Sequence, residues 1–193
     1  DNTHQIKDIE SLIERKVDLL IVAPNEAEAI TPVIEKAYDA GIPVILVDRK
    51  INSKKYTAYV GADNYEIGRK AGEYIADRLG GKGRVIEITG LRGSTPAVER
   101  HRGMMEALKA VPGVQVVASA EAGWFRQKAG EVMDTLLDAH PQVNLVFAQN
   151  DRMAIGAYEK ARQKNRAGQI AFVGVDAVAG GVESVAEGKL DAT

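Results

Sequence analysis

The sequence contains no cysteine. This absence excludes disulfide bonds, thiolate metal sites and cysteine nucleophiles. It leaves the compartment open, because a protein of an oxidising compartment can fold without disulfides. Histidine is scarce as well, and none of the three histidines stands at ligand spacing from another. The sequence therefore predicts neither a metal ion nor a cofactor.

Motifs that carry catalysis are also missing. The chain has no G-x-S-x-G nucleophile elbow and no H-E-x-x-H zinc motif. One glycine loop, 90–95 (GLRGST), stands between an apolar run and a helical pattern, as a phosphate cradle would. It lacks both the P-loop lysine and the G-x-G-x-x-G spacing, which favours a plain tight turn. We therefore expect a binding domain, not an enzyme.

Neither sign of charge dominates, since 25 basic residues face 27 acidic ones for a net charge of -2. Without a basic excess, this segment is a poor candidate for nucleic-acid binding. No apolar run approaches the roughly 18 residues of a membrane span, and no signal peptide is present. The first and last residues resemble no natural terminus, so we expect an internal piece of a longer protein.

Short apolar runs rich in Val, Ile and Leu alternate with amphipathic helical stretches along the whole chain. Such runs suit strands that are covered on both faces, and the alternation predicts α/β architecture with parallel sheets flanked by helices. The segment 56–59 (YTAY) differs, and we interpret it as a crossover between two lobes. The predicted strands are 17–22, 43–47, 84–89, 114–118, 144–148 and 170–175, and the predicted helices are 5–15, 26–40, 65–79, 96–110, 126–139, 151–164 and 178–187.

Hydrogen-bonding side chains follow the predicted strands, where open parallel sheets bind their ligands. Asp48 and Arg49 follow one strand, Asn150 follows another, and Asp176 follows the last. Carboxylates, guanidinium groups and amides suit vicinal hydroxyls, which both donate and accept. The two aspartates could instead be helix caps or turn formers. We expect Asp151 to cap the next helix, which leaves Asn150 to face a ligand.

Two further candidates lie outside the strand ends. Arg100 falls on the apolar face of its helix and near the positive end of the helix dipole, so it needs a partner such as Asp176 or Asp48. Trp124, the only tryptophan, lies in a loop before a helix. It could be a core residue or could stack on the apolar face of a sugar ring. The sequence leaves these two roles open.

These motifs, taken in order, resemble periplasmic binding proteins of the ribose-binding type, a type I fold that also forms the core of LacI-type repressors. The resemblance covers the whole chain, and the combination is specific although each piece is weak alone. The segments that carry it are 48–49 (DR), 97–103 (AVERHRG), 147–151 (FAQND), 174–176 (GVD) and 188–193 (GKLDAT).

Other segments resemble the periplasmic sensor domains of hybrid two-component histidine kinases more closely. In those proteins a membrane helix joins the binding domain to a cytoplasmic kinase, so the resemblance implies a membrane-anchored parent protein, a periplasmic location for this segment and a homodimer. The segments are 19–26 (LLIVAPNE), 31–33 (TPV), 41–50 (GIPVILVDRK) and 56–69 (YTAYVGADNYEIGR).

The resemblance implies a monosaccharide ligand, a pentose or a hexose, bound between two lobes that close about a hinge near residues 62–63. It implies a first lobe over 1–62 that lacks its first strands and exposes apolar surface, and a nearly complete second lobe over 63–193. Two alternatives remain, a sugar receptor of an ABC transporter and the effector-binding core of a LacI-type repressor. The implied ligand contacts are Asp48, Arg49, Arg100, Asn150 and Asp176, with ring stacking by Trp124.

Overall fold

A computed structural model describes all 193 residues and divides the chain into two compact units. Unit 1 holds residues 1–64 and 92–98, and unit 2 holds residues 65–91 and 99–193. The short segment 92–98 therefore returns to unit 1 and contains the first turn of a helix that continues in unit 2. None of the helices is long and apolar enough to cross a membrane.

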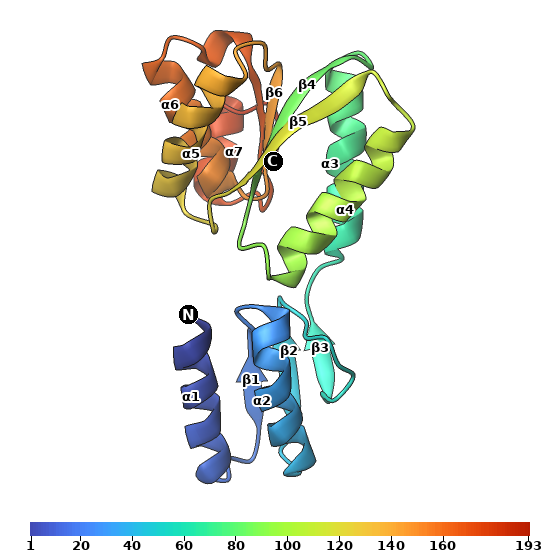
Figure 1. Ribbon diagram of the computed structural model, residues 1–193, viewed down its shortest axis with the longest axis vertical. Helices are drawn as coiled ribbons and strands as arrows, with labels where there is room; N and C mark the ends of the chain where they lie inside the picture. Colours follow the sequence, from blue (N-terminus) through green and yellow to red (C-terminus); the bar gives the residue numbers. More distant parts are fainter. The chain divides into compact units, whose positions relative to one another are not determined.

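Unit 1 is a three-stranded parallel sheet in the order β1-β2-β3 with two helices (Figure 1). Strand β3 corrects one prediction, because segment 56–59 was expected to be a crossover and its last residues instead pair with β2. The segment has no run of Val, Ile and Leu, which hides the strand in the sequence pattern. The elements are α1 (Asn2–Glu14), β1 (Leu20–Val22), α2 (Ala27–Asp39), β2 (Val44–Val47) and β3 (Ala58–Val60).

One face of this sheet is covered and the other is not. The residues of β1 and β2 that point to α1 and α2, such as Leu20 and Val44, are buried in one apolar cluster. On the opposite face Ile21 of β1 is 63% exposed and Val60 of β3 is 62% exposed. Parallel sheets normally have both faces covered. The apolar surface expected for the first lobe is thus present on this face.

Unit 2 is a four-stranded parallel sheet in the order β5-β4-β6-β7. Its observed boundaries lie within three residues of the predicted ones, and α5 has the predicted bounds. The elements are α3 (Asn64–Arg78), β4 (Gly83–Thr89), α4 (Thr95–Lys109), β5 (Val114–Glu121), α5 (Arg126–Ala139), β6 (Leu145–Ala148), α6 (Asp151–Gln163), a 3-10 turn (Ala167–Gln169), β7 (Ala171–Val173) and α7 (Ala179–Ala186).

Helices cover both faces of the unit 2 sheet (Figure 1). Helices α3 and α4 supply Ile75 and Met104 to an apolar cluster on one face, and α5 and α6 supply Met133 and Ala157 to a cluster on the other. Side chains of β4 alternate between the two clusters. The ends of β5, β6 and β7 are thereby fixed in a rigid frame, and the loops that follow them carry the predicted site residues Trp124, Asn150 and Asp176.

Candidate functional site

The unit 1 half of the predicted site follows strand β2. The Asp48 amide donates to the Val60 carbonyl (2.9 Å), and the Asp48 carboxylate is 61% exposed. Its Oδ2 lies 3.7 Å from Nε of Arg49. Arg49 also donates from Nη1 to the Asn25 carbonyl (2.9 Å), which ties the loops after β1 and β2 together. Asp48 and Arg49 therefore lie together at the carboxyl edge of the sheet.

In unit 2, Arg100 is only 7% exposed, on the apolar helix face where the sequence placed it. Its Nη1 lies 3.5 Å from Oδ1 of Asp176 and donates to the Gln149 carbonyl. Its guanidinium carbon lies 5.8 Å from the ring centroid of Trp124. A buried cation needs such partners, because desolvation and the helix dipole both oppose it. Of the two predicted anions, Asp176 lies beside Arg100 within unit 2.

Trp124 lies three residues after the end of β5 and has features of both proposed roles. Its backbone is left-handed, with φ of 76°, and its ring packs against the margin of the core. A Cβ atom on Gly90 would lie 2.1 Å from the indole, so the glycine allows the ring to lie flat on the loop after β4. The ring is half-buried. A core contact on one side thus leaves part of the indole accessible.

The loop after β6 corrects the cap assignment. Asn150, not Asp151, is the N-cap of α6, and its Oδ1 accepts from the Met153 amide at 2.8 Å. An asparagine at the N-cap satisfies an unpaired amide of the first turn as well as an aspartate does. Nδ2 of Asn150 points the other way, 3.4 Å from the Trp124 carbonyl. Asn150 therefore caps the helix and presents only its amide nitrogen beside Trp124.

Asp151 is instead fully buried and holds the loop after β7. Its Oδ2 accepts from the Val178 amide (3.0 Å) and its Oδ1 from the Thr193 hydroxyl, which in turn accepts from the Ala177 amide (3.0 Å). The neighbouring residue Asp176 has φ of 111° and lies two residues before the N-cap of α7, so it is not a helix cap. This clamp fixes Asp176 beside Arg100.

Three predicted ligand residues share an uncommon backbone conformation. Asp48, Trp124 and Asp176 all have positive φ, with values of 63°, 76° and 111°. Residues other than glycine rarely adopt this region, and the cost is of order 1–3 kcal/mol at each position. Such strain gathers at binding sites, where the fold holds a side chain in one orientation. Three of the six non-glycine residues with positive φ are thus candidate ligand residues, and Asp48 and Asp176 among them also follow strand ends.

The sequence interpretation missed two residues behind this cluster. Glu87 on β4 and Gln149 after β6 are fully buried, and Nε2 of Gln149 donates to Oε1 of Glu87 at 2.9 Å. Oε1 of Gln149 accepts from the Gly90 amide at 3.0 Å. The signal was present in 84–89 (RVIEIT), because a carboxylate within an apolar strand needs a specific partner. The apolar residues around Glu87 predict a buried strand but do not show which residue its carboxylate contacts.

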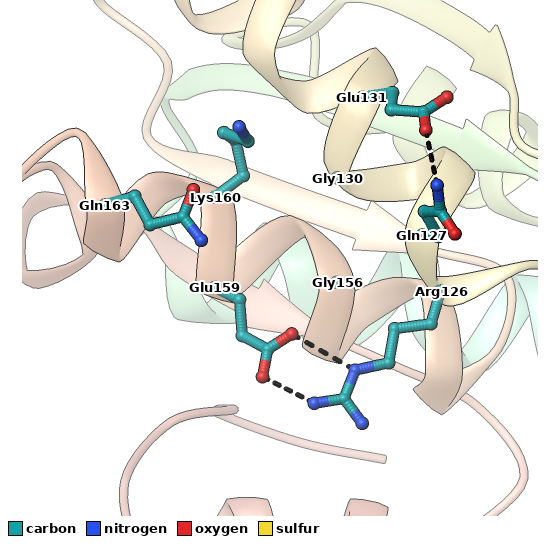
Figure 2. A pocket seen from close by; sticks show the side chains of 8 residues that line it. All are labelled: Arg126, Gln127, Gly130, Glu131, Gly156, Glu159, Lys160 and Gln163. Atoms are coloured by element: carbon teal, nitrogen blue, oxygen red, sulfur yellow. Dashed lines mark hydrogen bonds and ion pairs between the residues drawn. The ribbon is translucent and has the colours of Figure 1, made fainter.

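A groove of about 470 Å³ lies elsewhere, on the outer surface between α5 and α6 (Figure 2). Arg126 and Glu159 form a two-pronged ion pair across it, and this carboxylate raises the pKa of Arg126. None of the predicted ligand residues lines it. Arg126, Glu131, Glu159 and Lys160 each have a partner, within the groove or in the nearby Asp134, and no group of three or more acidic or histidine residues could hold a metal ion. We therefore place the candidate site at the strand ends.

Known proteins show the same architecture. The model of the periplasmic binding protein domain family matches residues 1–193. Ribose import binding protein RbsB of Bacillus subtilis is 35% identical over 193 residues, covering 100% of this chain and 62% of that protein. RbsB of Escherichia coli is 36% identical, covering 98% of this chain and 63% of that protein. The chain thus spans less than two thirds of the length of these relatives.

Among solved structures, the fructose-binding periplasmic domain of a hybrid two-component system is 51% identical, with a TM-score of 0.96. The match covers 99% of this chain and 65% of that one. A galactofuranose-binding protein matches with a TM-score of 0.94 at 31% identity, covering 98% of this chain and 67% of that one. Each of these relatives is named for binding, and none for catalysis.

Proposed function

Because the chain belongs to the periplasmic binding protein family, we propose that it is part of an extracytoplasmic sensor domain that binds a monosaccharide and signals to a histidine kinase. Its two parallel-sheet units have the type I fold of that family. The observation that carries the sensor assignment is the 51% identity to the fructose-binding periplasmic domain of a hybrid two-component system, against 35% and 36% to the two ribose import binding proteins.

The chemistry of the unit 2 cluster supports a neutral sugar as the ligand. Arg100 supplies a fork of N–H donors, Asp176 supplies carboxylate acceptors, and Trp124 supplies an apolar ring face beside them. A sugar offers hydroxyls that both donate and accept, next to an apolar C–H face. The charges of Arg100 and Asp176 offset each other, so the cluster has no net attraction for an anion or a cation.

We further propose that the sugar contacts Asp48 and Arg49 of unit 1 as well as Arg100, Trp124, Asn150 and Asp176 of unit 2. The proposed lobes are residues 1–62 and 63–193, joined by a hinge near 62–63, except that segment 92–98 belongs to the first compact unit. A ligand that contacts both lobes stabilises the closed arrangement by its differential contacts. In a membrane-anchored dimer, this closure would change the relative position of the two membrane-proximal segments that lead to the kinase.

Calorimetric titration of the complete periplasmic domain tests the ligand class. We expect D-fructose, or another pentose or hexose such as D-ribose or D-allose, to bind and to raise the melting temperature. Fructose 6-phosphate and amino acids serve as controls. A domain stabilised only by a phosphorylated sugar or an amino acid would contradict the proposal.

A transport receptor is the second candidate, supported by the RbsB relatives. The two functions predict different domains in the complete gene and different neighbouring genes. A sensor requires a membrane helix and a kinase in the same reading frame, whereas a receptor ends after its binding domain and lies among transporter genes. Sequencing of the complete gene decides between them. Sugar-dependent autophosphorylation of the full-length protein in membranes would then establish the sensor.

A further inference from the structure

A buried carboxylate lies at the centre of the unit 2 sheet. Glu87 is on the inner strand β4 and is fully buried, between Ser119 of β5 and Phe147 of β6 in the strand register. Burying an ionised carboxylate costs several kcal/mol unless hydrogen bonds compensate. An apolar residue would serve a merely structural strand better. The position of Glu87 therefore calls for an account of what its oxygens hold.

Three side chains from three different elements meet the Glu87 carboxylate. Its Oε1 accepts from Nε2 of Gln149, after β6, at 2.9 Å. Its Oε2 accepts from the Ser119 hydroxyl of β5 at 2.8 Å and lies 2.8 Å from Nδ1 of His101 on α4. In the tautomer with the proton on Nδ1, His101 donates to this oxygen. Glu87 thus ties β5, α4 and the end of β6 to β4.

Each of these ties leads to a candidate ligand residue. His101 follows Arg100 directly on α4, and Gln149 directly precedes Asn150. The Gln149 carbonyl accepts from the Arg100 guanidinium. Strand β5, which carries Ser119, ends three residues before Trp124.

The Gln149 side chain extends the network to the ring of Trp124. Its Oε1 accepts from the Gly90 amide at 3.0 Å, and Gly90 lies directly under the indole. A shift of this amide would therefore move the surface on which Trp124 rests. Trp124 is the only tryptophan of the chain, so its fluorescence reports on this surface without interference.

We infer that Glu87 and Gln149 form a positioning pair for the sugar site. The inference rests on the proposed sugar binding. Neither side chain touches the ligand. Glu87 fixes Gln149, and Gln149 fixes Arg100 through its carbonyl and the Trp124 platform through Gly90. Affinity for the sugar therefore depends on the hydrogen bond between these two buried side chains.

A charge-relocation experiment tests the pair. In Gln149→Glu, two carboxylates face each other at hydrogen-bond distance, and at a pH where both are ionised their repulsion displaces residue 149. The double variant Glu87→Gln with Gln149→Glu restores a donor between them, and the new carboxylate still accepts from the Gly90 amide. We expect the sugar Kd of the complete domain to rise by about 30-fold or more in Gln149→Glu and to return within about threefold of wild type in the double variant.

Trp124 emission of the sugar-free protein gives a second readout. It should shift in Gln149→Glu and return in the double variant. Gln115→Glu, an exposed change on β5 that adds the same charge, is the matched control and should bind and emit as wild type. A merely structural role would lower the melting temperature of Gln149→Glu without this pattern.

The outcomes separate the two proposals. Wild-type affinity in Gln149→Glu, or a double variant as weak as the single one, overturns the positioning pair. If Gln149→Glu does not fold, the double variant decides by the same threefold criterion. If the wild-type domain binds none of the sugars, the proposed function fails instead. The emission of the sugar-free variants then still decides whether Glu87 and Gln149 set the geometry around Trp124.

Discussion

Arg100 is the residue on which the unit 2 half of the proposed site depends most directly. Its guanidinium contacts the Gln149 carbonyl, the Asp176 carboxylate and the Trp124 ring together. A lysine keeps the charge but cannot present donors in a planar fork. A methionine fits the apolar helix face but has no donor. The two substitutions together therefore separate the contribution of the charge to sugar affinity from that of the planar donor geometry.

We expect Arg100→Met to abolish measurable sugar binding and Arg100→Lys to weaken it by about 10- to 100-fold, since each hydrogen bond to a charged group contributes roughly 1.5–3 kcal/mol. Both variants should remain folded by circular dichroism. Calorimetric titration gives the affinities. Binding by Arg100→Met within threefold of wild type would make Arg100 a structural residue.

Trp124 and its neighbour Phe125 form a matched pair for testing ring stacking. Trp124 is half-buried on Gly90, whereas Phe125 is 69% exposed. Trp124→Ala should weaken sugar affinity by roughly 1–3 kcal/mol, while Phe125→Ala should leave it unchanged. Sugar should also change the wild-type emission. Lost stability with unchanged affinity in Trp124→Ala would instead support the core role.

At the scale of elements, two glycines decide how closely α5 and α6 pack. A Cβ atom on Gly156 of α6 would lie 2.1 Å from the Arg126 carbonyl, whereas one on Gly130 of α5 would lie 3.4 Å from the Gly156 carbonyl. The first distance is a clash with backbone that cannot move alone. The second is an ordinary contact. The same substitution should thus have opposite effects at the two positions.

Gly156→Ala should force the helices apart and destabilise unit 2 by about 1–3 kcal/mol. Gly130→Ala should be neutral or stabilise by up to about 1 kcal/mol, because alanine favours a helix interior. Thermal and urea unfolding measure both. Equal stability of the two variants would show that the helices adjust to the added methyl group.

The elements themselves were largely predictable from the sequence. Helix α5 was predicted with its observed bounds, because its periodicity is bracketed by a loop and a proline. Strand β3 was missed because its segment 56–60 (YTAYV) lacks the continuous Val, Ile and Leu run that marked β1, which is equally short. The helix cap was assigned to Asp151 instead of Asn150, since either residue type caps a helix and only the positions of Thr193 and Val178 show that Asp151 turns inward.

The buried network behind the site was not predictable. Glu87 and Gln149 are 62 residues apart, and their contact depends on β4 and β6 being neighbours in the sheet. Strand order is a property of tertiary packing and leaves no local trace in the sequence. The proposed ligand residues at strand ends followed from the sequence, because open parallel sheets generally bind their ligands there. The side chains that position them did not.

For the whole molecule, the uncovered face of the unit 1 sheet makes the 193-residue chain sensitive to its surroundings. Ile21 points to this face, and its neighbour Val22 points to the core. Ile21→Thr should lower the fluorescence of the apolar dye ANS and change stability by less than about 0.5 kcal/mol.

Val22→Thr is the matched control, because it buries a hydroxyl in the core and should cost about 1–3 kcal/mol without lowering dye binding. Dye titration and urea unfolding of the two variants supply the measurements. Undiminished dye binding by Ile21→Thr would show that the apolar face is covered in solution.

The left-handed backbone at Asp48, Trp124 and Asp176 has a consequence for evolution and engineering. Glycine occupies this conformation with less strain, so a population of variants selected for heat resistance alone should drift toward glycine at these positions. Each such replacement would also delete a side chain that we assign to the ligand. Variants selected for heat resistance should therefore gain thermal stability and lose sugar binding together. Retention of the two aspartates and the tryptophan in a lineage would in turn be a signature that its members still respond to a ligand.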